Sequence, residues 1–158
     1  NTNFSIPHEV LKGLNHVFQM NDHNSLFITM WYLVYNKSTR ELSYAGAGHP
    51  PLIIFTPVGL PIKITSQNAI IGVDDQFKFR SGTIKIEDNT EIYIYSDGAY
   101  EVKLPDEKFM NTDHLADYLL ENRNINAEEI DKLYNYLLEL NLGCGLDDDF
   151  TMMKIAFF

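Results

Sequence analysis

A single cysteine, Cys144, excludes a disulfide within the chain and a cysteine-rich zinc site. The sequence also lacks any apolar run near the ~20 residues that a helix needs to cross a bilayer. Basic residues are few: 12 Lys and Arg stand against 22 Asp and Glu, a formal net charge of −10. That charge disfavours nucleic acids and anionic membranes, and it favours a divalent cation or a basic protein surface. These features predict a cytoplasmic protein.

The composition predicts a folded chain. Hydrophobic residues make up 45% and aromatic residues 13% of the 158 residues, which is enough for a sizeable core. The sequence shows no internal repeat, low-complexity tract or linker. Because single cores are usual below about 250 residues, residues 1–158 are expected to form one domain.

The hydrophobic pattern predicts a helix, then strands, two helices and a last strand. The first helix is expected from Ser5, as the N-cap, to Met20, and residues 25–35 predict a strand buried on both faces. The turn at 36–39 pairs that strand with 41–45. The remaining expected elements are strands at 52–55, 83–86, 91–95 and 150–158, and a turn at 87–89. One further helix is expected to begin near Thr112, and another is expected to begin at the N-cap Asn126 and to end at Gly143. The order indicates an α+β fold of layered antiparallel sheets flanked by helices.

Asp97 follows a run, EIYIYSDG, whose alternate residues would face opposite sides of a strand. A carboxylate just past a strand end can leave the core while its backbone stays anchored, and Gly98 lets the chain turn there. The segment therefore offers a metal-binding carboxylate. Taken by itself, it also fits an ordinary Asp-Gly turn.

Three adjacent carboxylates, Asp147, Asp148 and Asp149, precede the last expected strand. Neighbouring negative charges repel one another, so either bulk water or a bound cation has to offset the repulsion. Hard ions such as Mg²⁺ and Mn²⁺ prefer carboxylate oxygens. Strand alternation would direct Asp148 to the side opposite its two neighbours. The segment alone also fits a solvated acidic loop.

The segment YAGAGHPPL places glycines before His49 and two prolines. The glycines permit close backbone approach, and Pro50 forces His49 out of the helical region. The segment has neither the Lys and Ser/Thr of a P-loop nor the spacing of a dinucleotide fingerprint, so no nucleotide cradle is predicted. His49 fits either a hydrogen-bonded structural histidine or a catalytic or metal-binding role.

In this order, the segments YAGAGHPPLI, IIGV, IYSDGAYE and DDDFTMMKIAF resemble the SpoIIE/RsbU branch of the PPM-type serine/threonine phosphatases. The leading SIPHEVLKGLN and LFITM are also similar to that branch, so the resemblance extends from about Ser5 to Phe158. It implies two antiparallel sheets flanked by helices, with a pair of Mg²⁺ or Mn²⁺ ions at one end.

By this resemblance, Asp97 and Asp148 would bind the same metal ion, and Asp149 is the next candidate ligand. The implied reaction is hydrolysis of phosphoserine or phosphothreonine by a metal-activated water, without a covalent enzyme intermediate. The implied substrate is a phosphorylated regulatory protein of bacterial signalling, such as an anti-sigma-factor antagonist. An upstream sensor or receiver domain would control the activity.

Two motifs of the family, G-D-x-x-D and D-V-x-G-x-G, have no match in this sequence. In the family they supply the aspartate that bridges both ions and a backbone carbonyl ligand. The chain is therefore expected to lack the first strands of the domain, to bind metal weakly and to be inactive or nearly so. Unpaired sheet edges would also favour homo-oligomers, formed by strand exchange.

Two other functions stay open at this point. The chain could be a degenerate phosphatase-like module that docks a signalling partner without catalysis, or a structural dimerisation piece. Retention of Asp97, Asp148 and Asp149 favours the enzyme. The missing bridging aspartate favours the binding module.

Overall fold

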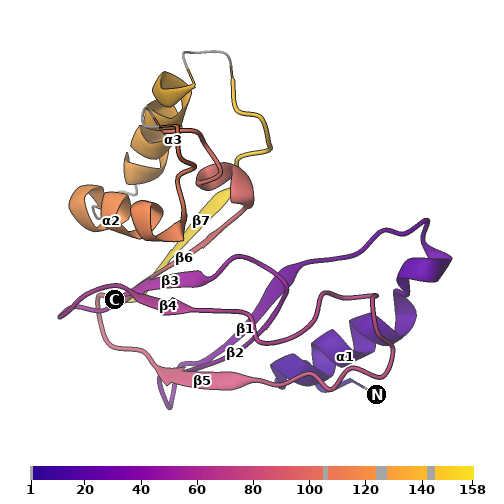
Figure 1. The fold of residues 1–158 in the computed structure, drawn as a ribbon. Coiled ribbons are helices and arrows are strands. Elements are labelled where there is room, and N and C mark those ends of the chain that lie inside the picture. The colour runs from indigo at the N-terminus through magenta and orange to yellow at the C-terminus, as the bar shows by residue number, and fades with distance from the viewer. Residues whose placement is uncertain (1, 105–106, 124–127, 142–144) are drawn as a thin grey trace. The chain divides into compact units, whose positions relative to one another are not determined.

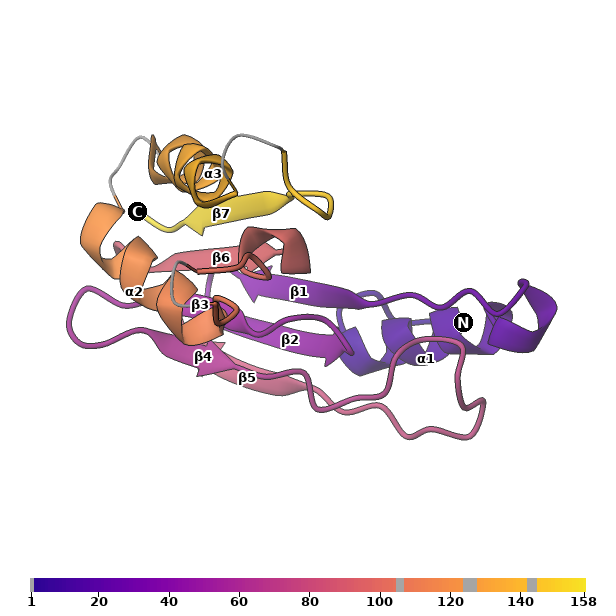
Figure 2. The same cartoon turned by 45° about the horizontal axis from the view of Figure 1, so that its top comes forward.

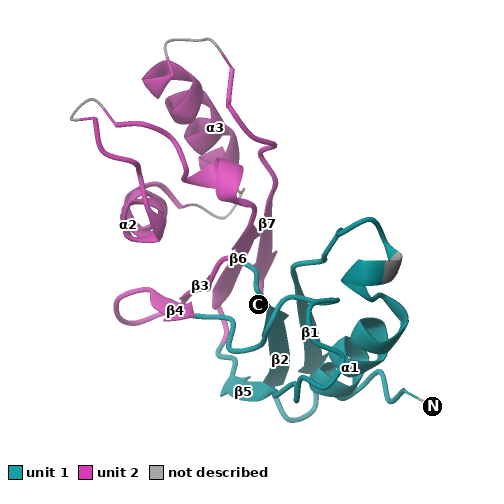
Figure 3. Cartoon of the chain, turned by 45° about the vertical axis from the view of Figure 1, so that its right-hand side comes forward, with its two compact units in different colours: residues 1–49, 65–87 teal, residues 50–64, 88–158 magenta. Residues whose placement is uncertain are grey.

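The computed structural model describes residues 2–104, 107–123, 128–141 and 145–158. Their contacts divide the chain into two compact units (Figure 3): unit 1 comprises Asn1–His49 and Thr65–Glu87, and unit 2 comprises Pro50–Ile64 and Asp88–Phe158. Within the described ranges, every helix is too short or too polar to traverse a bilayer. Each unit contains one antiparallel sheet with helical segments.

Unit 1 is a three-stranded sheet with a helix against it (Figure 1). Its elements are α1 (Pro7–Val17), the 3₁₀ turn η1 (Met20–Asp22), β1 (Met30–Asn36), β2 (Glu41–Ala47) and β5 (Gly82–Lys85). The strands lie in the order β1-β2-β5, and both pairings are antiparallel. The hairpin predicted across the polar turn at 36–39 is therefore confirmed.

Two expectations for unit 1 are wrong in detail. The N-cap of α1 is Ile6 rather than Ser5, no side chain caps the helix, and α1 ends at Val17. Strand β1 begins only at Met30, and most of its side chains are half-buried instead of buried on both faces. The apolar pattern between 25 and 29 was misleading because the chain there includes exposed Leu26 and Phe27.

The core of unit 1 lies between α1 and one face of its sheet. Its buried members are Leu11, Ala45, Ala47, Ile71 and Phe79. Buried Asn15 donates to the Asp74 carbonyl at 2.9 Å and accepts from the Gly72 N–H at 2.8 Å. These bonds fix the 70–75 loop to the helix and satisfy a polar side chain that would otherwise destabilise the core.

Unit 2 is a four-stranded antiparallel sheet in the order β4-β3-β6-β7. Its elements are β3 (Leu52–Phe55), β4 (Ile62–Ile64), β6 (Glu91–Tyr95), the 3₁₀ turn η2 (Asp97–Ala99), α2 (Thr112–Asn122), α3 (Glu128–Leu140) and β7 (Met152–Ala156). Figure 2 shows β7 along β6, with α3 next to β7.

The strands predicted on either side of the turn at 87–89 are present, but they do not pair with each other. Strand β5 pairs with β2 in unit 1, whereas β6 pairs with β3 and β7 in unit 2. A polar turn shows where a strand ends, but it does not decide which strand becomes the partner.

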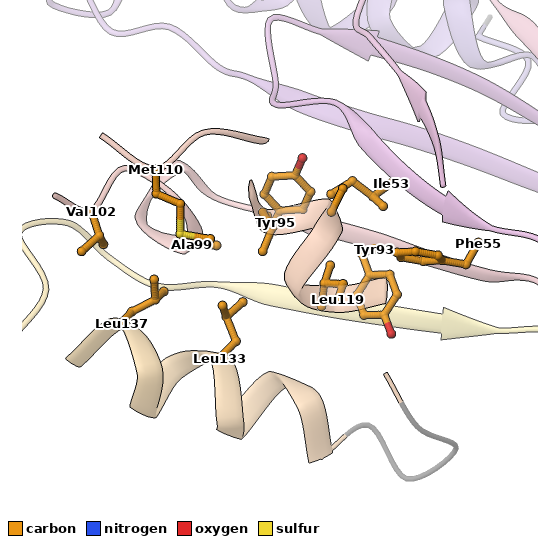
Figure 4. Packing of buried hydrophobic residues seen from close by; sticks show 12 residues of the cluster. Ile53, Phe55, Tyr93, Tyr95, Ala99, Val102, Met110, Leu119, Leu133 and Leu137 are labelled. Atoms are coloured by element: carbon orange, nitrogen blue, oxygen red, sulfur yellow. The ribbon is translucent and has the colours of Figure 1, made fainter. Parts of the chain in front are cut away.

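Both helices of unit 2 pack on the same face of its sheet (Figure 4). Leu133 and Leu137 of α3 point toward the sheet and share one core cluster with Tyr93 and Tyr95. Burial of each leucine contributes roughly 1.5–3 kcal/mol to stability. The capping box of α2 joins Asn111 to the backbone of the first turn. The expected N-cap Asn126 and the expected helix end at Gly143 lie outside the described residues.

Candidate metal centre where β6 and β7 meet

Asp97 lies two residues past the end of β6, in the single turn η2. Its carbonyl oxygen accepts the N–H groups of Tyr100 at 2.9 Å and Glu101 at 2.8 Å. One carboxylate oxygen accepts the N–H of Gly98 at 3.1 Å, and the side chain is exposed. The backbone of Asp97 is therefore held by the turn while its carboxylate faces solvent.

The acidic segment 147–149 is separated from β7 by two residues, and all three of its residues are exposed. The chain bends at Asp147 and Asp148, so the strand alternation expected for these residues is wrong. One carboxylate oxygen of Asp148 accepts the N–H of Asp149 at 2.7 Å. This bond restricts the Asp148 side chain and involves only one of its two carboxylate oxygens.

The two acidic segments meet at one end of the sheet because β6 and β7 are antiparallel neighbours. Tyr95 pairs with Met152, and the Ser96 N–H donates to the Thr151 carbonyl at 3.0 Å. The Ser96 hydroxyl bridges the two segments: it donates to the Asp149 carbonyl at 2.7 Å and accepts from the Thr151 N–H at 2.9 Å. Residues separated by 53 positions in sequence are thereby fixed side by side.

Gly98 is required by this close approach. A Cβ atom at this position would lie 2.6 Å from the Asp149 carbonyl oxygen and 3.1 Å from that of Asp148. Both atoms belong to the backbone, so neither can move aside as a flexible side chain would. Glycine therefore allows η2 to pack directly on the segment that carries Asp148 and Asp149.

The donor chemistry of this corner fits a hard divalent ion. Asp97, Asp148 and Asp149 offer carboxylate oxygens, the ligands that Mg²⁺ and Mn²⁺ prefer. Within the described ranges, however, no group of three or more His, Cys, Asp or Glu side chains is placed closely enough to hold a metal ion. The nearby Tyr100 hydroxyl has a raised pKa because of burial first, with the charges of Glu101 and Asp97 adding to it.

His49 belongs to the other compact unit. It lies in unit 1, where Nδ1 is 3.2 Å from the hydroxyl oxygen of Thr29, and it is half-buried. This contact favours the interpretation of His49 as a hydrogen-bonded structural residue. Cys144 lies outside the described residues.

Sequence reasoning missed a buried ionic cluster in unit 2. Glu129 is fully buried and accepts from the Tyr93 hydroxyl at 2.5 Å and from Lys154 Nζ at 2.9 Å. Lys154 also contacts Glu91 at 2.7 Å, and Glu91 pairs with Arg123 at 3.1 Å. A signal was present: Glu129, Leu133 and Leu137 recur at the four-residue spacing of the buried stripe of α3.

The family comparison matches almost the whole chain: residues 2–158 fit the family described as Stage II sporulation protein E (SpoIIE). The phosphoserine phosphatase RsbU of Bacillus subtilis (strain 168) is 30% identical over 151 residues. That match covers 94% of this chain and 44% of RsbU, so the chain spans less than half the length of this relative.

Solved structures share the fold. The SiaA-PP2C domain of Pseudomonas aeruginosa matches 97% of this chain and 60% of its own, with a TM-score of 0.81 at 17% identity. The Mn-presoaked phosphatase domain of SpoIIE from Bacillus subtilis matches 90% and 61%, with a TM-score of 0.63 at 14% identity. RsbX in complex with magnesium matches 92% and 61%, with a TM-score of 0.62 at 19% identity. These likenesses confirm the expected α+β fold of antiparallel sheets with helices.

Proposed function

The chain belongs to the SpoIIE family, in the RsbU-like branch of the PPM-type phosphatases, and we propose that it hydrolyses phosphoserine or phosphothreonine on a regulatory protein. The observation that supports this most directly is the packing of Gly98 on the Asp148–Asp149 backbone, which joins two acidic strand ends. The substrate class is supported by the similarity to RsbU, a phosphoserine phosphatase. That residues 1–158 form one such domain stays a prediction.

Asp97 and Asp148 would hold one Mg²⁺ or Mn²⁺ ion, with Asp149 as a further ligand. A bound divalent ion supplies Lewis-acid polarisation of a phosphoryl oxygen and lowers the pKa of a water molecule. The contribution of this chain is positional. The Ser96 hydroxyl ties the two segments together, and the turn at Gly98 keeps the Asp97 carboxylate in solvent.

The substrate that fits the family is a phosphorylated signalling protein, such as an anti-sigma-factor antagonist, under control of a sensor or receiver domain. Low activity of these 158 residues alone stays a prediction, because the two family motifs named above are unmatched in the sequence. Self-association through sheet edges also stays a prediction.

Phosphate release from a phosphoserine protein with Mn²⁺, at high protein concentration, tests the proposal. Asp97→Asn and Asp148→Asn should each remove the Mn²⁺-dependent release. The matched control is Asp117→Asn, which changes the same charge on the exposed side of α2. Equal and measurable Mn²⁺-dependent release by all four proteins would refute the assigned roles.

The second candidate function is a non-catalytic module that docks a phosphorylated partner. One observation favours it: the sequence has no match to the two family motifs that supply the bridging aspartate and a carbonyl ligand. The same assay separates the two functions. A binding module would retain the phosphoprotein on a column and release no phosphate at any Mn²⁺ concentration.

A further inference from the structure

Unit 1 contains a half-open pocket of about 80 Å³, and the candidate metal ligands of unit 2 are not among its lining residues. Every residue that lines it belongs to unit 1. The side chains that matter for its chemistry are Trp31, Tyr44, Thr65, Gln67 and Arg80. The pocket opens on the sheet face opposite α1, because Trp31 and Tyr44 alternate with residues that pack against that helix.

Two glycines fix the aromatic wall of the pocket. A Cβ on Gly46 would lie 2.6 Å from the Trp31 ring, and one on Gly82 would lie 2.4 Å from the Tyr44 ring. Each ring therefore lies directly across the glycine of a neighbouring strand. The rings are 6.2 Å apart in an edge-to-face arrangement, which gives the wall a defined shape.

A buried asparagine fixes the polar wall. Asn68 donates to the carbonyl oxygens of Gly46 at 2.8 Å and Arg80 at 3.0 Å, and it accepts from the Arg80 N–H at 2.7 Å. The backbone of Arg80 is thus held against the end of β2. Because Arg80 lies two residues before Gly82 in an extended segment, its side chain leaves the backbone on the face that carries Tyr44.

The charge around the pocket suits an anion. Among the residues that the structure describes, the Arg80 guanidinium has no ion-pair or hydrogen-bond partner. The pocket lining includes no Asp or Glu. Unit 1 carries as many Lys and Arg as Asp and Glu residues, so the formal charge of −10 belongs to unit 2. Unit 1 taken by itself is therefore formally neutral, and its charge does not oppose an anion in this pocket.

The size of the pocket narrows the ligand further. An ordered water occupies about 10–15 Å³ of cavity volume, so a cavity of 80 Å³ holds about five to eight water-sized groups. The side chain of phosphoserine has about six non-hydrogen atoms, three of them strong acceptor oxygens. We propose that this pocket binds a phosphomonoester group, with Arg80 pairing with the phosphate oxygens and the Trp31–Tyr44 wall covering the carbon atoms. The choice of a phosphorylated protein side chain as its source rests on the proposed function.

Trp31 is the only tryptophan of the chain, so its fluorescence reports directly on the pocket. We would titrate the full chain in EDTA with a phosphoserine peptide, the same peptide without phosphate, and inorganic phosphate. The expected result is a saturable change with the phosphopeptide and none with the unphosphorylated peptide. A response to inorganic phosphate of equal affinity would identify the free ion as the ligand source, whereas a tighter phosphopeptide would identify the protein side chain.

Arg80→Gln should weaken phosphopeptide binding about tenfold or more, because a charge-assisted contact to phosphate is lost. Lys78→Gln is the matched control: it removes an exposed cation two residues away that does not line the pocket, and it should bind as the parent does. The pocket assignment is overturned if the fluorescence does not change, if both peptides act alike, or if Arg80→Gln and Lys78→Gln weaken binding equally.

Asp97→Asn separates this proposal from the metal centre. In EDTA, which removes divalent ions, the variant should bind phosphopeptide as the parent does. In a separate titration without EDTA, the variant should have lost Mn²⁺ binding. Loss of phosphopeptide binding in this variant would assign the response to unit 2 and overturn the pocket. Failure of Asp97→Asn to alter Mn²⁺ binding would refute the metal centre and leave the pocket standing.

Discussion

Two tyrosines on the same strand provide a matched test of the buried ionic cluster. Tyr93 and Tyr95 face the same side of β6 and are 0% and 2% exposed. The Tyr93 hydroxyl donates to the buried Glu129 carboxylate at 2.5 Å, whereas the Tyr95 hydroxyl has no hydrogen-bond partner among the described residues. The change from tyrosine to phenylalanine therefore removes a hydrogen-bonded hydroxyl at 93 and a hydroxyl without a hydrogen-bond partner in the described residues at 95.

The expected magnitudes differ in sign. Tyr93→Phe removes a hydrogen bond to a charged group, which contributes about 1.5–3 kcal/mol to the free energy of unfolding. For a chain of this size, a loss of about 2 kcal/mol lowers the Tm by about 4–8 °C. Tyr95→Phe removes a buried hydroxyl with no partner in the described residues, so the free energy of unfolding should stay the same or rise by up to about 1 kcal/mol.

Urea unfolding followed by circular dichroism at the helix band measures both variants, since α2 and α3 lie in unit 2. The m-values should match that of the parent, so that a shift of the midpoint reports stability alone. If Tyr95→Phe lowers the free energy of unfolding as much as Tyr93→Phe, the cluster around Glu129 is not what stabilises β6 against α3.

Three further outcomes are expected. Gly98→Ala should lower both stability and Mn²⁺ affinity, because the added Cβ would lie 2.6 Å from the Asp149 carbonyl oxygen. The control in the same calorimetric and urea measurements is Gly13→Ala, whose added Cβ would contact only the flexible Thr2 side chain. Burial and the bond to Glu129 raise the pKa of the Tyr93 hydroxyl. The protonated hydroxyl therefore stabilises the fold fully below pH ~10, and this stabilisation is lost as the pH rises further. Urea midpoints should fall above pH ~10, and they should fall less steeply in Tyr93→Phe. Light scattering of the full chain should show association that grows with concentration, and a stable monomer at high concentration would contradict the strand-exchange hypothesis.

Local patterns in the sequence predicted several elements correctly. The run at Leu52–Phe55 is a fully buried strand, and the segment at Glu91–Tyr95 is a strand with Asp97 just past its end. Leu133 and Leu137, four residues apart, form part of the buried stripe of α3. These features depend on near neighbours in the chain, which a single sequence contains.

Features that depend on distant partners were not predictable in the same way. The strands on either side of the turn at 87–89 belong to different sheets, since β5 pairs with β2 and β6 pairs with β3. Glu129 takes a buried position because Lys154 and Tyr93 satisfy its carboxylate. The close packing of Gly98 on Asp149 likewise follows from the β6–β7 register, which no local motif encodes.

The most direct test of the metal centre is calorimetric titration of the 158-residue chain with Mn²⁺. The parent and the control Asp117→Asn should bind one ion per chain weakly, while Asp97→Asn and Asp148→Asn should each lose the binding heat. If those two variants bind Mn²⁺ as the parent does, the joined ends of β6 and β7 do not form the metal centre.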